Sequence, residues 1–176
     1  MITASRYHDF SAGHRVYGHE SKCAHLHGHN YRVHFTCLAP DLDSVGRVID
    51  FSVIKDKLCD WVEVEWDHRF LVWQEDPFSN DLPLLDDEVV VLPFNPTAEN
   101  MAKFLLNIIG PKQLEGTDVT LVKVVVEETR KCLATASIDP PGLSAFEELN
   151  KSLIGMQTQI QGKRAPAADS DDTRAP

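Results

Sequence analysis

Residues 31–37, YRVHFTC, alternate between apolar and polar side chains at every step. A period of two is typical of a β-strand that buries one face and exposes the other. The apolar phase comprises Tyr31, Val33, Phe35 and Cys37. The alternation therefore predicts a half-buried strand that lies against the core of a folded domain.

Further strands are predicted on both sides of this stretch. Residues 3–16 are predicted to form a partner strand, and residues 119–128 and 132–138 to form two more near the other end of the domain. Each of these segments is rich in apolar residues that suit a pleated, half-buried surface. Together with the strand at 31–37 they predict a four-stranded antiparallel sheet.

Two helices are predicted between the strands. The first begins with Ser52 as its cap, and the second begins near residues 95–100, NPTAEN, and ends at Gly110 and Pro111. A short extended piece, residues 89–94, lies between them. The predicted fold class is α+β, with an antiparallel four-stranded sheet and both helices on one face.

The length of 176 residues fits one ordinary domain, which we place at residues 1–140. Residues 141–161 are expected to add a helix, because Ser144 and Glu147 have the spacing of a capping box. Residues 162–176 contain no large apolar side chain and are expected to be a disordered tail.

Composition and charge exclude several classes of function. The formal net charge of −10 argues against a nucleic-acid partner, since binding a polyanion needs a basic field. No stretch approaches the length of a membrane span and the first residues do not resemble a leader, so we expect a cytoplasmic protein with no membrane partner. The four cysteines form no C-x-x-C pair, which indicates reduced thiols.

The histidines are concentrated in the first part of the chain, and three alternate within residues 22–31, KCAHLHGHNY. His27 and His29 form an H-x-H pair, and in an extended backbone both rings point to the same side, where they can share one ion. A catalytic zinc needs a third protein ligand. From spacing alone this ligand is either His25, which shares the parity, or His14, which arrives from the neighbouring strand.

Three residues outside the H-x-H pair are candidates for acid–base chemistry. Cys23 is either a further metal ligand or a free thiolate beside an electropositive centre, and the alternative without function is a buried inert thiol. Asp67 and His68 offer a carboxylate next to an imidazole, an arrangement suited to proton relay or simply to a solvated turn.

Glu128 continues the apolar phase of the predicted strand at 119–128. Thr120, Val122, Val124 and Val126 share that phase. A carboxylate at the end of an apolar face is costly to bury unless a donor pairs with it. Glu128 is therefore a candidate to hold a ligand rich in N–H groups, and the alternative is a strand-end residue in solvent.

Six segments taken together, in this order and spacing, resemble the 6-pyruvoyltetrahydropterin synthase and 6-carboxytetrahydropterin synthase family. They are FSAGHRV (10–16), KCAHLHGHNY (22–31), VIDFSVIK (48–55), WDHRFL (66–71), PTAEN (96–100) and VEET (126–129). The resemblance runs from about Tyr7 to Ser137, and it departs in the long acidic segment 72–93, which we expect on the outside.

The resemblance implies a tunnelling fold (T-fold) and a role for each matching residue. It also implies a homohexamer built as a dimer of trimers, with active sites at subunit interfaces. The implied roles are zinc ligation by His14, His27 and His29, catalysis by Cys23, Asp67 and His68, and substrate binding by Glu128 and Thr97.

The implied activity is the zinc-dependent conversion of 7,8-dihydroneopterin triphosphate to 6-carboxy-5,6,7,8-tetrahydropterin, acetaldehyde and triphosphate, a step towards queuosine and other 7-deazapurines. One alternative is the 6-pyruvoyl branch, in which triphosphate leaves but the side chain is retained. An alternative of another class is a non-catalytic zinc-binding module on the same fold. The presence of Cys23, Asp67, His68 and Glu128 argues against the module, because binding a metal does not require them.

Overall fold

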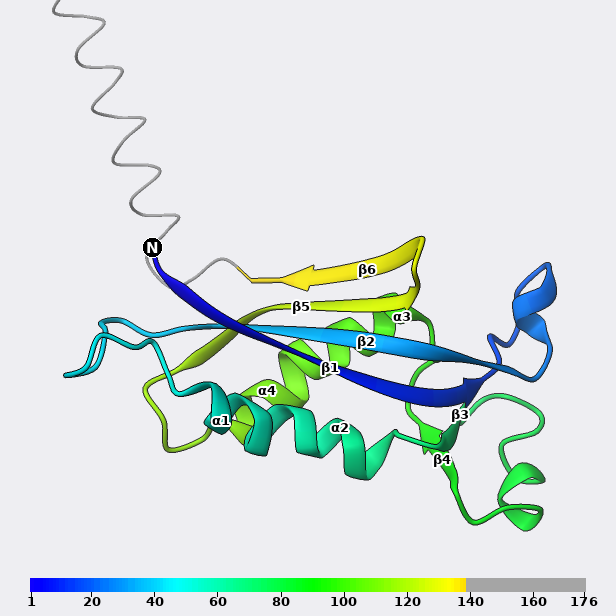
Figure 1. Ribbon diagram of the computed structural model, residues 1–176. Coiled ribbons are helices and arrows are strands. Elements are labelled where there is room, and N and C mark those ends of the chain that lie inside the picture. Colours follow the sequence, from blue (N-terminus) through cyan, green and yellow to red (C-terminus); the bar gives the residue numbers. More distant parts are fainter. Residues whose placement is uncertain (139–176) are drawn as a thin grey trace, which may run out of the picture. The chain divides into compact units, whose positions relative to one another are not determined.

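The computed structural model describes residues 1–138, which form a mixed sheet with two helices on one face (Figure 1). The six strands lie in the order β4-β3-β1-β2-β5-β6. Their bounds are β1 Thr3–His14, β2 His27–Leu38, β3 Arg69–Trp73, β4 Val89–Leu92, β5 Thr120–Thr129 and β6 Cys132–Ser137. The α+β class and the two helices on one face are confirmed.

The prediction of four antiparallel strands was correct for β1, β2, β5 and β6 but missed two strands. β3 pairs parallel to β1 over only Ala12–His14, and β4 pairs parallel to β3. Both strands are short, five and four residues, so neither shows a long alternation in the sequence. β4 occupies the first four residues of the piece at 89–94, which was predicted to be extended but not to join the sheet.

Each predicted helix is continuous but contains a π-helical turn. The first consists of α1 Phe51–Ile54, η2 Lys55–Cys59 and α2 Asp60–Glu65, and the second of α3 Ala98–Phe104, η4 Leu105–Ile109 and α4 Gly110–Gln113. The first N-cap is Asp50, whose side chain accepts the N–H of Ser52, so the assignment of Ser52 as the cap was wrong by two residues. The second helix continues past Pro111, because a new helical segment starts after the π turn and proline is tolerated in a first turn.

The core lies between the helices and the face of the sheet that carries Val33 and Phe35. Both of these side chains are fully buried, as are Ile54 and Leu58 from the first helix and Leu105 from the second. The apolar phase predicted for residues 31–37 is thus the core face of β2. Because strand side chains alternate, the same face of β1 carries Phe10, Ala12 and His14.

A bulge in β5 changes which residues of that strand face the core. The pairing of β2 with β5 shifts between Thr36 and Cys37, which leaves Val122 as the extra residue. As a result Leu121 is buried and Thr120 is exposed. After the bulge, Val124, Val126 and Glu128 share one face of the strand, as predicted. The prediction that Thr120 lies on this same face was wrong.

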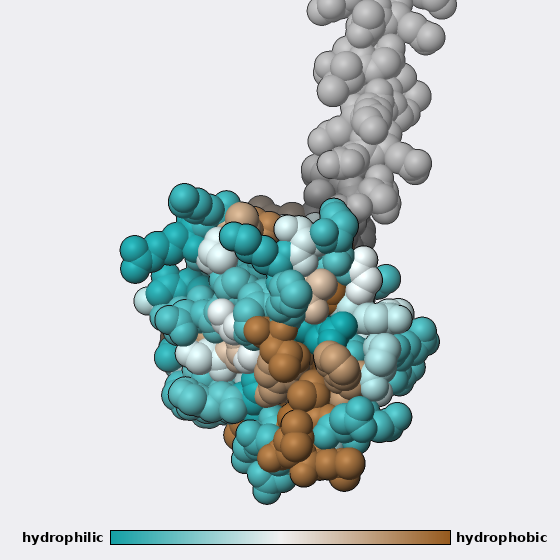
Figure 2. All heavy atoms as spheres, turned by 90° about the vertical axis from the view of Figure 1, so that its right-hand side faces the viewer, coloured by the Kyte–Doolittle hydropathy of each residue, from teal (hydrophilic) through white to brown (hydrophobic). Residues whose placement is uncertain are grey.

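The connection between β3 and β4 lies in the acidic segment 72–93 and contains the short η3, Leu82–Leu84. Figure 2 shows apolar side chains gathered on this end of the molecule, and the exposed large apolar residues of the connection are Phe78, Leu84 and Leu85. Most of its acidic residues are exposed, as expected, but Asp76 is buried.

The predicted helix at 141–161 and the predicted tail at 162–176 lie outside the described residues. Within residues 1–138, no helix is both long and apolar enough to cross a membrane.

Candidate functional site

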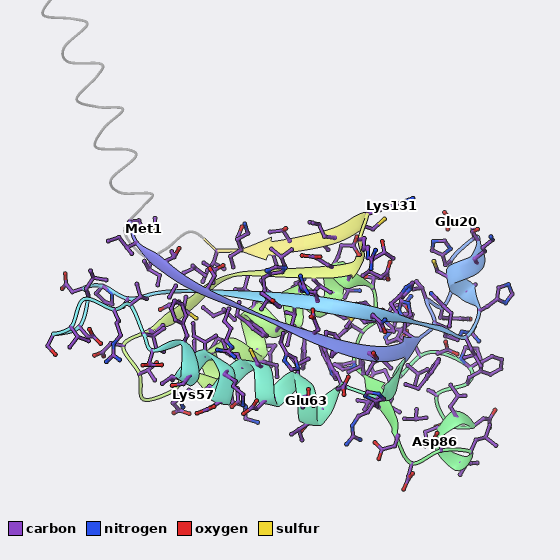
Figure 3. All side chains as sticks on the ribbon, in the orientation of Figure 1. Met1, Glu20, Lys57, Glu63, Asp86 and Lys131 are labelled. Atoms are coloured by element: carbon purple, nitrogen blue, oxygen red, sulfur yellow. The ribbon has the colours of Figure 1, made fainter. Side chains whose placement is uncertain are left out.

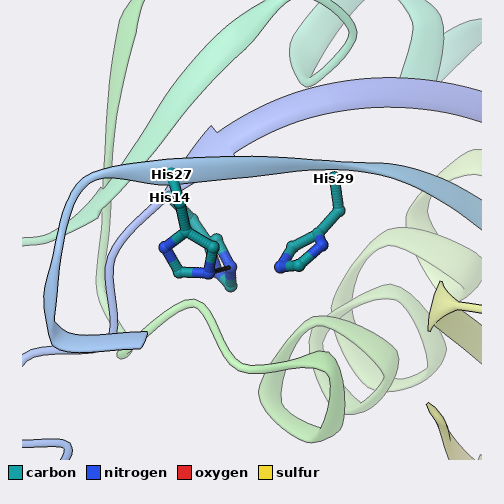
Figure 4. A group of neighbouring side chains, drawn as sticks. All are labelled: His14, His27 and His29. Atoms are coloured by element: carbon teal, nitrogen blue, oxygen red, sulfur yellow. Dashed lines mark hydrogen bonds between the residues drawn. The ribbon is translucent and has the colours of Figure 1, made fainter. Parts of the chain in front are cut away.

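Three histidines meet at one end of the sheet (Figure 4). The antiparallel register places His14 of β1 directly opposite His27 of β2, and His29 follows two residues later on the same face. One ring nitrogen of each lies within 4.8 Å of the others. Of the two third ligands that spacing left open, His14 joins the H-x-H pair, whereas His25 does not belong to the group.

Hydrogen bonds to the backbone fix the tautomers of His14 and His27. The Nδ1 of His14 lies 2.8 Å from the carbonyl oxygen of Pro96, and the Nδ1 of His27 lies 2.8 Å from that of His25. A carbonyl only accepts, so each Nδ1 carries the proton and each Nε2 presents a lone pair. Burial lowers the pKa of His14 to about 4, although the hydrogen bond to Pro96 opposes the shift, so this ring is neutral at pH 7.

The arrangement of lone pairs fits a metal cation. The Nε2 atoms of His14 and His27 are 3.0 Å apart, the contact drawn as a dashed line in Figure 4. With both Nδ1 protons bound to carbonyl oxygens, neither Nε2 has a proton to donate in the neutral rings, so two lone pairs face each other. The Nε2 of His29 is buried and has no hydrogen-bond partner among the described residues. Burial also lowers the pKa of His29. Three neutral imidazole nitrogens are the donor set of a catalytic zinc site with an open position, and they suit other divalent transition metals too.

Glu128 brings a carboxylate to the edge of this cluster. Its Oε1 lies 3.7 Å from the Nε2 of His14 and 3.9 Å from that of His29. The β5–β6 pairing shifts between Glu127 and Thr129, so Glu128 occupies a second bulge, a device that commonly re-aims a side chain next to a functional site. The carboxylate is only partly exposed, as its apolar phase in the sequence suggested, and it lies beside the histidine cluster.

A pocket of about 260 Å³ brings Glu128 together with two other predicted site residues. Cys23 comes from the short η1 helix, Lys22–Ala24, and its thiol is half-buried. Thr97 is the N-cap of α3, where its side chain accepts the N–H of Asn100 at 3.3 Å. Cys23, Thr97 and Glu128 therefore line one cavity next to the three histidines.

Asp67 and His68 line a different pocket, of about 540 Å³, whose other walls come mainly from β1, β2 and β5. One carboxylate oxygen of Asp67 accepts the backbone N–H of Ser11 at 2.7 Å, and the other lies 2.6 Å from the Nδ1 of His68. Burial alone would raise the pKa of Asp67, but these hydrogen bonds outweigh it and hold the pKa below its usual range.

His68 has an unusual backbone conformation. Its φ of 55° is in the left-handed region, where no other non-glycine residue of the described part of the chain lies. Such a conformation costs about 1 kcal/mol or more in a residue with a Cβ, and residues held in it cluster at active sites and ligand-binding sites. The side chain is 83% exposed, so the Asp67–His68 pair faces outwards from its own chain. A single chain therefore places this pair and Cys23 in different pockets.

Sequence reasoning missed the backbone groups that orient the cluster. Pro96 and His25 act through their carbonyl oxygens, which any residue carries, so no side-chain pattern marks them. The side chain of Asn95, which hydrogen-bonds to the backbone of Tyr17, was also missed, although Asn95 directly precedes the PTAEN segment.

Comparison with known proteins identifies relatives over the described part of the chain. The sequence profile of the family described as 6-pyruvoyl tetrahydropterin synthase matches residues 3–139. A protein from Rickettsia bellii named 6-carboxy-5,6,7,8-tetrahydropterin synthase is 38% identical over 134 residues, which cover 75% of this chain and 97% of that protein. A protein of the same name from Aquifex aeolicus is 33% identical and covers 68% of this chain and 88% of its own length.

Solved structures agree with the fold. The 6-pyruvoyl tetrahydropterin synthase of Caenorhabditis elegans superposes with a TM-score of 0.57 at 25% identity, covering 78% of this chain and 96% of that one. An uncharacterized protein from Wolinella succinogenes superposes with a TM-score of 0.70 at 24% identity, covering 78% of this chain and 98% of that one.

Proposed function

Because the chain belongs to the 6-pyruvoyl tetrahydropterin synthase family, whose members are lyase-type enzymes acting on pterins, we propose that it makes 6-carboxy-5,6,7,8-tetrahydropterin. The proposed substrates are 7,8-dihydroneopterin triphosphate and water, and the other products are acetaldehyde and triphosphate. The names of the Rickettsia and Aquifex relatives favour this product over the pyruvoyl one. The product would enter queuosine biosynthesis.

The observation that carries the proposal is the cluster of His14, His27 and His29 beside the pocket of Cys23 and Glu128. We assign the three histidines as ligands of Zn²⁺, in keeping with the Nδ1 hydrogen bonds of His14 and His27 and with the close approach of one ring nitrogen from each residue. Zinc, when bound, supplies Lewis acidity towards oxygen atoms of the substrate side chain.

Glu128 and Thr97 are assigned to the pterin. A carboxylate accepts hydrogen bonds from the N–H groups along one edge of a pterin ring, and charge-assisted bonds of this kind are stronger than neutral ones. The Oε1 of Glu128 faces the histidine cluster, so an anchored ring would hold its side chain towards the metal ligands. Thr97 lines the same pocket from the start of α3.

Cys23, Asp67 and His68 are assigned to proton transfer. The thiolate of Cys23 takes a proton from the substrate side chain on one side, and His68 gives or takes a proton on the other while Asp67 orients its ring. Cys23 and the Asp67–His68 pair line different pockets of one chain. This separation supports sites shared between subunits of a homohexamer, in which the outward-facing His68 of one copy serves the Cys23 of another.

Product analysis tests the proposal. Zinc-loaded protein is incubated with 7,8-dihydroneopterin triphosphate, and the pterin product is identified by mass spectrometry alongside an assay for acetaldehyde. We expect the 6-carboxy product with one acetaldehyde per turnover. A pyruvoyl product without acetaldehyde would move the protein to the other branch, and bound zinc without turnover would favour the non-catalytic zinc-binding module.

The Cys23→Ala variant is the matched control for that experiment. It should retain zinc while product formation stops, because the three nitrogen ligands remain. Loss of zinc from this variant would instead make Cys23 a ligand.

A further inference from the structure

The loop that joins β1 to β2 carries Cys23, and its own hydrogen bonds do not fix it to the rest of the domain. The N–H of Val16 donates to the carbonyl of Cys23 at 2.8 Å, which ties the two sides of the loop together. Gly18 permits the turn, with φ of 82°. Figure 3 places Glu20, at the tip of the loop, beyond the end of the sheet. The position of Cys23 therefore depends on contacts from other elements.

Asn95 makes two such contacts, both to the backbone of Tyr17. Its Oδ1 accepts the N–H of Tyr17 at 3.1 Å, and its Nδ2 donates to the carbonyl of Tyr17 at 2.8 Å. One side-chain amide thus satisfies both backbone groups of a single residue, as a neighbouring strand would. Tyr17 is adjacent to Val16, so the restraint passes through one residue to the hydrogen bond that holds Cys23.

Asn95 is itself held by the first turn of α3. Its carbonyl accepts the N–H of Thr97 at 2.7 Å and the Nδ2 of Asn100 at 2.9 Å. The next residue, Pro96, accepts the Nδ1 proton of His14. Three consecutive residues thus have three different contacts. Asn95 contacts the loop that carries Cys23, Pro96 contacts the candidate metal ligand His14, and Thr97 forms part of the pocket wall.

A second anchor holds the start of the loop. The Nε of Arg15 lies 2.9 Å from the buried carboxylate of Asp76, and its guanidinium lies 4.4 Å above the ring of Phe78. Arg15 directly follows His14 at the end of β1, where strand pairing already fixes the backbone. The amide of Asn95 therefore acts on the part of the loop that strand pairing leaves free.

We propose that Asn95 is a positioning residue for Cys23: its two hydrogen bonds to Tyr17 set the place of the thiol relative to the three histidines and to Glu128. The inference rests on the proposed function, in which Cys23 transfers protons. A displacement of about 1 Å in a reacting group lowers the rate of the chemical step far more than substrate binding. The positioning of Cys23 thus acts on kcat.

Two variants and a matched pair of controls test the proposal on the zinc-loaded full chain. Asn95→Ala removes both hydrogen bonds, and Asn95→Asp removes the donor and sets a carboxylate against the carbonyl of Tyr17. The controls are Asn107→Ala and Asn107→Asp, which make the same changes at an exposed asparagine of η4. The measurements are kcat, KM, zinc per chain, hydrogen–deuterium exchange at the Tyr17 amide and the rate of Cys23 alkylation by iodoacetamide.

In both Asn95 variants we expect kcat to fall at least about tenfold while KM stays within about threefold. Zinc per chain is unchanged, because the carbonyl of Pro96 belongs to the backbone. Exchange at the Tyr17 amide accelerates in Asn95→Ala, which removes the acceptor of that N–H, whereas Asn95→Asp retains an acceptor oxygen. The half-buried Cys23 is alkylated faster in both variants because the loop opens. The Asn107 controls match the wild type in every measurement.

Three outcomes overturn the proposal. A kcat within about twofold of the wild type, despite faster exchange at Tyr17, shows that the chemical step does not need this restraint. If the variants lose zinc to the same extent as they lose kcat, Asn95 acts by holding His14 in place rather than by positioning Cys23. Fast exchange at Tyr17 in the wild-type protein shows that the two hydrogen bonds do not persist in solution, and this measurement stands even where a variant fails to fold.

The test also separates this inference from the proposed function. If the wild-type protein does not convert the pterin triphosphate, the proposed function fails, while exchange at Tyr17 and alkylation of Cys23 still report whether Asn95 fixes the loop.

Discussion

Backbone carbonyl groups, which are not themselves metal ligands, set the ring orientation and the tautomer of His14 and His27. The hydrogen bonds from Nδ1 to Pro96 and His25 orient the rings and leave each Nε2 free to bind a cation. His25 illustrates the difference between a side chain and a backbone group: its imidazole is outside the cluster, but its carbonyl fixes the tautomer of His27.

A pair of alanine substitutions distinguishes these two roles. His27→Ala should lose zinc and activity together, because it removes one of three nitrogens from the site. His25→Ala should keep stoichiometric zinc, since the carbonyl that orients His27 remains. The zinc content of both variants is measured by inductively coupled plasma mass spectrometry. Full zinc occupancy in His27→Ala would refute the assignment of His27 as a ligand.

The low pKa of His14 predicts a loss of stability in mild acid. The unfolded chain binds a proton at His14 below pH 6.5, whereas the folded chain resists protonation until pH falls to about 4. The free energy of unfolding of the metal-free protein should therefore fall as pH drops through this window, by about 3 kcal/mol in total. Denaturant titrations at several pH values measure it.

The matched variants for the pH experiment are His14→Asn and His25→Ala. The first should lose most of the dependence between pH 6.5 and 4, because no imidazole is buried at that position. The second should keep it, since His25 is exposed. An unchanged pH dependence in His14→Asn would contradict the explanation.

The candidate site residues could largely be selected from the sequence because their chemistry is carried by rare side chains in close spacing. The H-x-H pair depends only on strand geometry, and the choice between His14 and His25 came from the family resemblance. The partners of these residues are harder to predict: Pro96 lies 82 positions from His14, and Asn95 lies 78 from Tyr17. Such contacts depend on how elements distant in sequence pack together.

At the scale of the element, the spacing between β1 and β2 depends on glycine at the metal cluster. Gly28 lies between His27 and His29, opposite Gly13. A Cβ at Gly28 would lie 3.0 Å from the backbone oxygen of Ala12, which cannot move without shifting the strand. The glycine thus allows the close approach that brings His14 to His27.

Gly28→Ala should therefore weaken zinc binding as well as folding. We expect a loss of about 1–3 kcal/mol in stability and of at least about tenfold in zinc affinity, because the strands must separate at the cluster. Gly110→Ala is the control: its Cβ would meet the side chain of Leu121 at 2.5 Å, far from the histidines in the sequence. It should cost stability and leave zinc affinity unchanged, and equal zinc affinity in both variants would contradict the argument.

Long elements with a clear period were predicted well, and local irregularities were not. Helical spacing located both helices, but the π turns Lys55–Cys59 and Leu105–Ile109 carry no sequence pattern of their own. The two bulges of β5 were missed for the same reason, since an extra residue in one strand is defined by its pairing with another. The bulge at Glu128 shows that such an irregularity can lie at a candidate site residue.

At the scale of the whole molecule, the outer edge of β1 is only partly covered. β3 pairs with β1 over Ala12–His14, so the edge from Thr3 to Ser11 has no strand partner within residues 1–138. An exposed strand edge favours pairing with another chain. This edge and the outward-facing Asp67–His68 pair are the features that make a homo-oligomer with shared sites the natural expectation.

Complementation between two inactive variants tests the sharing of sites. Cys23→Ala and His68→Ala, each inactive alone, should regain activity when coexpressed with different affinity tags and purified as mixed oligomers. Random mixing would restore about a quarter of the sites, because an intact site needs Cys23 from one parent and His68 from the other. If mixed oligomers stay inactive while each variant binds zinc, the sites are not shared in this way.

Ser11 also limits how far a neighbouring strand can extend along β1. Its N–H is bound by the side chain of Asp67, and its carbonyl accepts the N–H of His68, so neither group is available to an incoming strand. Any added strand must therefore end before Ser11, which limits its pairing with β1 to Thr3–Phe10. In the proposed homo-oligomer we therefore expect a replacement of Asp67 to change how subunits align along β1, in addition to its effect on the proposed transfer of protons.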